Sequence, residues 1–196
     1  MEHDLLQLTI AREGHFRLES GHHGGRWLDL DGLFRDPARL APSIAALADL
    51  LRPHAPDVVC GPLIGGALVA QAVAASLGVE LSYTERFAPA EPAGMYGVKY
   101  IVPRGLRAHL AGKRVAIVDD AISAGSAVRT TFDEVVGLGG RPVAVGALLL
   151  LGVGAAPFFD QAGVPLSSVL ALSYDLHAPD RCPMCAAGQP LEDPLA

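Results

Sequence analysis

Two adjacent carboxylates, Asp119 and Asp120, follow a largely β-branched apolar run and precede a loop of small and hydroxyl-bearing residues. The run at 114–118 is typical of a buried strand, and a helical pattern covers 126–138. The loop between them therefore lies at a helix N-terminus, where free N–H groups and the helix dipole stabilise a phosphate. Carboxylates repel phosphate, but they accept hydrogen bonds from hydroxyls and bind divalent cations. This order predicts a ligand with a phosphate at one end and a cis-diol near a metal at the other, such as a ribose 5-phosphate.

The composition limits the class of protein. The chain has 196 residues, enough for one domain with a full core, and its 51% hydrophobic content argues against disorder. The net charge of −6 comes without a basic run, which argues against non-specific nucleic-acid binding. The longest apolar runs are too short for a membrane span, and the acidic start lacks a signal-peptide pattern. Three cysteines, an odd number, are typical of a reducing cytoplasm.

Helical and strand-like patterns alternate along the chain. We expect helices over 37–53, 65–77, 126–138 and 155–162, and strands over 57–60, 79–84, 98–102, 114–118, 143–151 and 169–172. Such alternation predicts an α/β fold with a mostly parallel, doubly wound sheet flanked by helices. Ligands of these sheets bind beyond the carboxyl ends of the strands. The residues that follow the strands at 57–60, 114–118 and 143–151 should therefore face one cleft.

The domain organisation follows from these patterns. We expect one domain over residues 1–177, with a flexible loop over about 86–105. A small N-terminal hood segment over about 1–35 is implied by the resemblance to a known family that is given below. Residues 178–196 are rich in proline and lack apolar periodicity, so they are expected to form an appended tail.

Four segments resemble a known family. Residues 118–126 (Val-Asp-Asp-Ala-Ile-Ser-Ala-Gly-Ser) resemble the phosphoribosyl-pyrophosphate (PRPP) signature of type I phosphoribosyltransferases. Residues 61–67 (Gly-Pro-Leu-Ile-Gly-Gly-Ala) look like the pyrophosphate loop of that family. Residues 16–21 (Phe-Arg-Leu-Glu-Ser-Gly) and 27–29 (Trp-Leu-Asp) are most similar to the orotate phosphoribosyltransferase group. The resemblance covers roughly residues 12–175.

The resemblance implies an enzyme that transfers the phosphoribosyl group of Mg-PRPP to a nitrogen of a base. The products would be a nucleoside 5′-monophosphate and pyrophosphate, as in pyrimidine biosynthesis. It also implies PRPP as co-substrate, Mg²⁺ as cofactor and a homodimer, without nucleic-acid or membrane partners.

The resemblance also assigns roles to residues. Asp119 and Asp120 would hold the ribose hydroxyls or Mg²⁺, and Arg86 and Lys99 would stabilise the departing charge. The 5-phosphate loop would comprise Ala121, Ile122, Ser123, Ala124, Gly125, Ser126 and Ala127. The pyrophosphate loop would comprise Ile64, Gly65 and Gly66. Weaker substrate contacts are expected from Glu19, Ser20 and His22.

Three departures from the family pattern bear on turnover. Glu19 stands in place of a lysine, residues 88–97 contain no lysine or histidine, and Ala127 replaces a hydroxyl-bearing residue. They favour an alternative, namely a regulatory protein that binds PRPP or a nucleotide without efficient turnover. Met95, Tyr96 and Tyr100 would either clamp an aromatic acceptor or pack the loop against the domain.

Two further groups of residues have open interpretations. His22 and His23 would either lie in a surface loop or contribute one substrate contact. Cys182 and Cys185 form a Cys-x-x-Cys pair that is compatible with zinc, with dithiol or disulfide chemistry, or with an unremarkable tail. The pair supplies two of the four ligands of a zinc site. Cys60 and His177, or a second subunit, would have to complete it.

Overall fold

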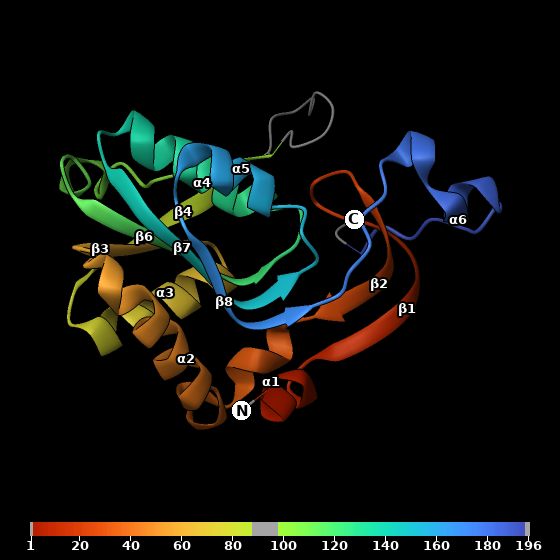
Figure 1. Ribbon diagram of the computed structural model, residues 1–196, viewed down its shortest axis with the longest axis horizontal. Helices are drawn as coiled ribbons and strands as arrows, with labels where there is room; N and C mark the ends of the chain where they lie inside the picture. Colours follow the sequence, from red (N-terminus) through yellow and green to blue (C-terminus); the bar gives the residue numbers. More distant parts are fainter. Residues whose placement is uncertain (1, 88–97, 195–196) are drawn as a thin grey trace.

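The computed structural model describes residues 2–87 and 98–194 and centres on one six-stranded sheet (Figure 1). In chain order the strands are β3 (Val58–Pro62), β4 (Glu80–Phe87), β5 (Lys99–Ile101), β6 (Arg114–Ile122), β7 (Arg141–Leu151) and β8 (Leu166–Leu172). Their spatial order is β5-β4-β3-β6-β7-β8, and only β5 runs antiparallel to its neighbour. The parallel sheet predicted from the sequence is confirmed.

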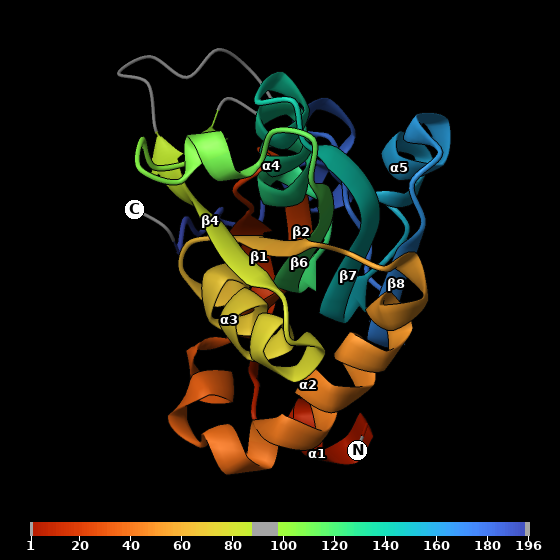
Figure 2. The same cartoon turned by 90° about the vertical axis from the view of Figure 1, so that its left-hand side faces the viewer.

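Helices cover both faces of this sheet (Figure 2). They are α2 (Pro37–Leu51) and α3 (Gly65–Leu77) on one face, and α4 (Ser126–Gly137) and α5 (Ala156–Ala162) on the other. The Asp36 side chain accepts hydrogen bonds from the first N–H groups of α2, as its position before Pro37 predicts. Gly78 ends α3 in the left-handed conformation, with φ of 71°. Two apolar cores, one on each face, hold the strands in place.

Two boundaries differ from the sequence-based prediction in ways that affect the site. Strand β6 continues to Ile122, so Asp119 and Asp120 lie within the strand rather than after it. Strand β4 continues to Phe87 and pairs with β5, so Arg86 lies in a strand rather than in the predicted loop. Residues 88–97, which include Met95 and Tyr96, lie outside the described residues.

The N-terminal region forms a separate small layer beside the sheet (Figure 1). It comprises α1 (Glu2–Gln7), the antiparallel hairpin of β1 (Ile10–Arg17) and β2 (His23–Asp29), and a 3₁₀ turn (Asp31–Arg35). The family resemblance predicted a hood segment here, but the sequence patterns did not predict its strands. We call the β1–β2 pair the hood hairpin.

Residues 173–194, which follow β8 and are called the C-terminal segment here, pack against the hood hairpin. This segment includes the short helix α6 (Pro183–Ala186). Glu192 pairs with β1 through two backbone hydrogen bonds of 2.8 Å, and His177 pairs with His23 through bonds of 2.8 and 2.9 Å. Residues that the sequence suggested to be a tail therefore form part of the layer that carries the hood. Among the described helices, none has both the length and the apolar character that a membrane crossing requires.

Candidate functional site

A pocket of about 450 Å³ lies at the carboxyl ends of β3 and β6 and is bordered by the hood hairpin. Parallel strands commonly present ligand sites at this edge. The predicted residues that line it are Glu19, Ser20, Ile64, Gly65, Gly66, Arg86, Asp119, Asp120, Ala121, Ser123, Gly125, Ser126 and Ala127. Thus one pocket contains both glycine-containing loops, the acidic pair and the turn of the hood hairpin.

Asp119 and Asp120 form the acidic side of the pocket. Asp119 Oδ1 accepts a hydrogen bond of 3.1 Å from the Asp120 N–H, and Asp120 Oδ1 accepts one of 2.7 Å from the Ala121 N–H. Burial raises the pKa of Asp119 well above its ordinary value, and the neighbouring Asp120 carboxylate raises it further. Burial also raises the pKa of Asp120. In the described part of the chain neither carboxylate has an ion-pair partner, so the pair is poised to accept a cation or hydroxyl donors.

The loop after β6 leads directly into α4. Gly125, with φ of 79°, adopts the left-handed conformation, and an added Cβ would lie 2.9 Å from the Ala155 Cβ. Ser126 begins the twelve-residue helix α4, so the loop N–H groups lie at the positive end of its dipole. The side chains of Ile122 and Ala124 are buried, and neither residue lines the pocket. The arrangement can receive an anion close to the acidic pair.

The second loop approaches the acidic pair so closely that only glycine fits. An added Cβ on Gly65 would overlap Asp120 Oδ2, and one on Gly66 would lie 2.6 Å from Asp119 Oδ1. The two glycines begin α3, so their conformation brings this helix N-terminus beside the carboxylates. The absence of a side chain leaves room for a ligand that spans both loops.

Glu19 contributes a third carboxylate from the hood. Its Oε1 accepts hydrogen bonds from Arg86 Nε at 3.0 Å and from Tyr100 Oη at 2.9 Å. Ser126 Oγ donates to Glu19 Oε2 at 3.4 Å, so the carboxylate reaches the start of α4. Burial and the nearby Glu19 charge raise the pKa of Tyr100, which keeps the phenol protonated. The charge of Arg86 therefore balances that of Glu19 in an ion pair. The Glu19 carboxylate lies on the side of the pocket where an anion is expected.

Three other predicted residues differ in their relation to the pocket, since Ser20 lines it and His22 and Lys99 do not. Ser20 is buried, and its Oγ lies 3.1 Å from His22 Nδ1. Burial lowers the pKa of His22, and the positive charge of Arg129 lowers it further. His22 is not among the residues that line the pocket. Lys99, in β5, pairs with Phe87 and also lies outside the lining set.

The apolar side of the pocket was predicted only in part, through the end of the strand at 143–151 and the Trp-Leu-Asp segment at 27–29, and Leu18, Leu30 and Tyr174 were missed. Its walls include Leu18, Trp27, Leu28, Leu30, Leu151 and Tyr174. Tyr174 follows β8, so the rule that ligands bind beyond strand ends could have identified it. Its phenol donates a hydrogen bond to the Arg26 carbonyl, which ties this wall to the hood hairpin.

Cys182 and Cys185 lie away from the pocket, beside the hood hairpin. The alternative in which Cys60 and His177 complete a site with them is wrong, because the nearby ligand-type side chains are His15 and His23. Cys60 is buried in β3, where desolvation raises the pKa of its thiol to about 12. The contribution of the two histidines was missed because hairpin pairing, not sequence spacing, brings them together.

Comparisons with known proteins identify relatives over most of the chain. A family described as phosphoribosyl transferase domain matches residues 30–164. Orotate phosphoribosyltransferase of Heliobacterium modesticaldum is 35% identical over 184 residues, which cover 93% of this chain and 89% of that protein. The corresponding protein of Thermotoga maritima is 31% identical over 195 residues and covers 97% and 95% of the two chains.

Solved structures share the fold. Adenine phosphoribosyltransferase from Thermoanaerobacter pseudethanolicus superposes with a TM-score of 0.67 at 21% identity, covering 88% of this chain and all of that one (100%). Orotate phosphoribosyltransferase of Mycobacterium tuberculosis in complex with inorganic phosphate gives 0.62 at 22% identity, covering 86% and 91%. At these identities the likeness establishes the architecture alone.

Proposed function

Because the chain belongs to the phosphoribosyltransferase family, we propose that it transfers the phosphoribosyl group of PRPP to a pyrimidine base, with orotate as the first candidate. The chain is a pentosyltransferase enzyme that depends on PRPP. Orotate is chosen because relatives named orotate phosphoribosyltransferase are 30–35% identical over most of the chain, which supports this acceptor. The observation that carries the proposal is the meeting of an acidic pair and two helix N-termini in one pocket.

The ribose part of PRPP would lie against Asp119 and Asp120. These carboxylates would accept hydrogen bonds from the 2- and 3-hydroxyls, directly or through Mg²⁺. The pair fits a divalent cation because two buried carboxylates are adjacent and have no ion-pair partner in the described part of the chain. When bound, Mg²⁺ would supply positive charge that offsets the charge of the diphosphate. The carboxylates themselves would favour positive charge developing on the ribose ring.

The two phosphate ends of PRPP would occupy different loops. Residues 121–127 would hold the 5-phosphate with backbone N–H groups and with the hydroxyls of Ser123 and Ser126. Ile64, Gly65 and Gly66 would hold the pyrophosphate at the start of α3. With both ends fixed, the ribose C1 would face the open part of the pocket, where the base enters. Holding the ribose C1 and the base in this geometry would contribute much of the rate enhancement.

Departure of pyrophosphate requires a cation near the breaking bond. In the reaction the C1–oxygen bond breaks, the pyrophosphate keeps the electron pair, and a base nitrogen bonds to C1 and releases its proton to solvent. Arg86 is the candidate cation because it lines the pocket, and Lys99 would have to reach inward from β5. The ion pair of 3.0 Å between Arg86 and Glu19 would have to loosen when the diphosphate binds. Arg86 would then pair with the diphosphate.

A direct assay tests this proposal. The protein is incubated with PRPP, Mg²⁺ and a panel of purine and pyrimidine bases, and pyrophosphate release is followed. We expect release with orotate, and a fall of roughly 10²–10³-fold or more when Asp119→Asn and Asp120→Asn are combined. Asp160→Asn, an exposed change on α5, is the matched control and should leave the rate unchanged.

Two outcomes would contradict the proposal. Tight PRPP binding without pyrophosphate release for every base would favour the regulatory alternative. Unchanged PRPP affinity in the double Asp variant would refute the site assignment. The family resemblance also leads us to propose a homodimer, which light scattering of the purified protein would test.

A further inference from the structure

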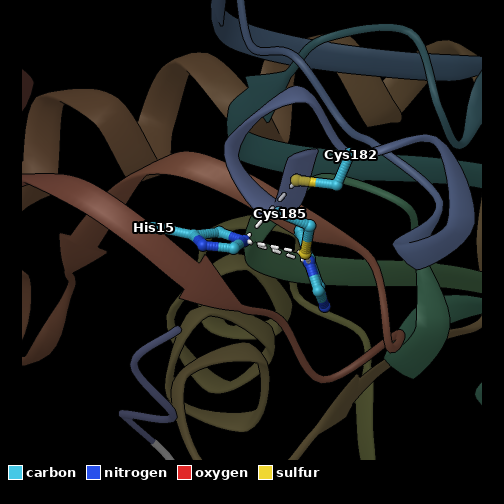
Figure 3. A group of neighbouring side chains, drawn as sticks. His15, Cys182 and Cys185 are labelled. Carbon is cyan, nitrogen blue, oxygen red and sulfur yellow. Dashed lines mark hydrogen bonds between the residues drawn. The ribbon is translucent and has the colours of Figure 1, made fainter. Parts of the chain in front are cut away.

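Four side chains of metal-ligand type meet between the hood hairpin and the C-terminal segment. They are His15 from β1, His23 from β2, and Cys182 and Cys185, and their ligand atoms all lie within 4.8 Å of one another. Figure 3 shows both thiols directed toward the ring of His15. His15, His23 and Cys182 are buried, with exposed fractions of 3%, 5% and 3%. We call these four residues the His–Cys cluster.

Four of the six distances between the ligand atoms are close to the edges of a small tetrahedron. The distance from His15 Nε2 to His23 Nδ1 is 3.1 Å. The nitrogen–sulfur distances are 3.5 and 3.7 Å from His15 Nε2 to the two thiols, and 3.3 Å from His23 Nδ1 to Cys185 Sγ. Tetrahedral zinc with ordinary Zn–N and Zn–S bonds places two nitrogens about 3.3 Å apart and a nitrogen and a sulfur about 3.6 Å apart. These four distances are close to those of a zinc site, and no two ligand atoms of the cluster are more than 4.8 Å apart.

Hydrogen bonding among the four groups does not account for this arrangement. A neutral imidazole nitrogen without a proton has one lone pair, yet three ligand-type atoms lie within 3.7 Å of His15 Nε2. One bond from His23 would satisfy that lone pair, so neither of the two nearby thiols could then donate a hydrogen bond to His15 Nε2. A cation at the centre gives each of the four atoms one partner.

A neighbouring carbonyl orients the ring of His15 as a metal ligand. His15 Nδ1 lies 3.0 Å from the carbonyl oxygen of Gln189. In the tautomer whose Nδ1–H donates to this oxygen, the lone pair of Nε2 points at the cluster. Metal-bound histidines commonly use their second nitrogen in this way, because the bond fixes both the tautomer and the ring.

We propose that the His–Cys cluster binds one Zn²⁺ ion in a closed tetrahedral site. Two thiolates and two neutral imidazoles suit this ion, and two negative charges balance it within a largely buried setting. All four positions are occupied by protein ligands, so the site is structural rather than catalytic. The proposal does not depend on the identity of the phosphoribosyl acceptor.

The zinc would fasten the C-terminal segment to the hood hairpin. The two cysteines lie near the chain end, whereas the two histidines flank the turn that carries Glu19 and Ser20. Both turn residues line the PRPP pocket. Zinc would therefore hold the hairpin that borders the pocket, and its removal should leave that hairpin more open to exchange with solvent.

Metal analysis of the whole protein tests the proposal. The protein is purified under reducing conditions, incubated with Zn²⁺, freed of excess metal, and analysed by plasma mass spectrometry. We expect about one zinc per chain, and less than about a tenth of that in Cys182→Ser/Cys185→Ser, because two of four ligands are lost. Cys60→Ala and His109→Ala, which change a cysteine and a histidine outside the cluster, should retain the zinc.

A spectroscopic measurement on the unaltered chain avoids dependence on whether the double variant folds. X-ray absorption of the zinc-loaded protein should show about two sulfurs near 2.3 Å and two nitrogens near 2.0–2.1 Å. Hydrogen exchange of the hood hairpin should rise when zinc is removed by a chelator. Absence of tight zinc, an oxygen-dominated shell, or a Cys182–Cys185 disulfide in the protein purified under reducing conditions would each overturn the proposal.

Discussion

The carboxyl-terminal ends of the central strands, called the sheet edge below, and the hood hairpin both border the proposed PRPP pocket, but different interactions position them. Asp119 and Asp120 lie on β6, a central strand packed between two apolar cores. Glu19 and Ser20 lie on the turn of a two-stranded hairpin, a structure that is marginal by itself in water. The hairpin is held by the C-terminal segment and by the His–Cys cluster.

This difference separates the site into a rigid half and an adjustable half. The sheet edge can hold like charges at close range because the buried β6–β7 pairing fixes their backbone. Of the described residues of the hairpin, only Leu28 packs against a core of the main sheet, so the turn of the hairpin is held less firmly than β6. We therefore expect substitutions at the sheet edge to abolish function and those in the hairpin to tune it.

Among single substitutions, the largest effect is expected where the sheet edge leaves no room for a side chain. In Gly65→Ala the new methyl group would overlap Asp120 Oδ2, so the carboxylate or the loop must move. We expect the turnover with PRPP to fall roughly 10²-fold, because positioning errors of this size are costly. Gly137→Ala is the control, since a Cβ there meets nothing within 4 Å. Equal activity of the two variants would contradict the tight packing of this edge.

The second prediction concerns the stability of the ligand-free protein. Because the native pKa of Asp119 is raised above the ordinary value of 3.8, the folded state favours the protonated carboxyl. The contribution of Asp119 to the free energy of unfolding is therefore fully favourable below the pKa that this carboxyl has in the unfolded chain. It is lost as the pH rises through the pKa of the carboxyl in the folded protein. Asp119→Asn should therefore raise the Tm at pH 8, because it removes the cost of burying a charged carboxylate beside Asp120. The rise should be about 2–4 °C for each 1 kcal/mol gained in the free energy of unfolding. The gain should shrink toward pH 4.

Calorimetry across this pH range checks the sign. Asp160→Asn should show no comparable pH-dependent gain. A gain that grows as pH falls would contradict the burial and repulsion assigned to Asp119. If Asp119→Asn raises the stability and abolishes the activity, the acidic pair lowers the stability of the fold in order to serve the reaction.

The sheet edge could be predicted from the sequence because its determinants are local. A strand, two carboxylates, a small-residue loop and a helix follow one another within residues 114–138. The end of β6 was set too early because aspartate is rare in strands, although here Asp119 is paired with Ala147 of β7. The parallel order of the remaining strands followed from their alternation with helices.

The hood could not be predicted in the same way because its determinants are distant in sequence. Glycines and charged residues interrupt the alternation that would mark β1 and β2. The His–Cys cluster joins residues 167 positions apart, His15 and Cys182, which no short motif connects. Only the pairing of the C-terminal segment with β1 shows which histidines accompany the Cys-x-x-Cys pair.

The third prediction tests the contact that joins the two regions. Glu19→Gln removes the negative charge that pairs with Arg86 and reaches Ser126. Because this carboxylate competes with an incoming phosphate, we expect the KM for PRPP to fall about 2–5-fold with little change in kcat, a scale set by partly exposed ion pairs. Glu13→Gln, on the same hairpin and paired with Arg26, is the matched control. A higher KM in Glu19→Gln alone would mean that Glu19 assists PRPP binding.

The smallest effect is expected where the hood hairpin meets the C-terminal segment through surface charge. Arg12 and Glu192 form an ion pair of 2.6 Å, but their side chains are 53% and 52% exposed. A double-mutant cycle with Arg12→Gln and Glu192→Gln should give a coupling of about 0.2–1 kcal/mol, which falls further at about 1 M salt. The backbone bonds of Glu192 with β1 do not involve its side chain and should persist in both variants. A coupling above about 2 kcal/mol would mean that charge, rather than backbone pairing and the His–Cys cluster, holds the segment in place.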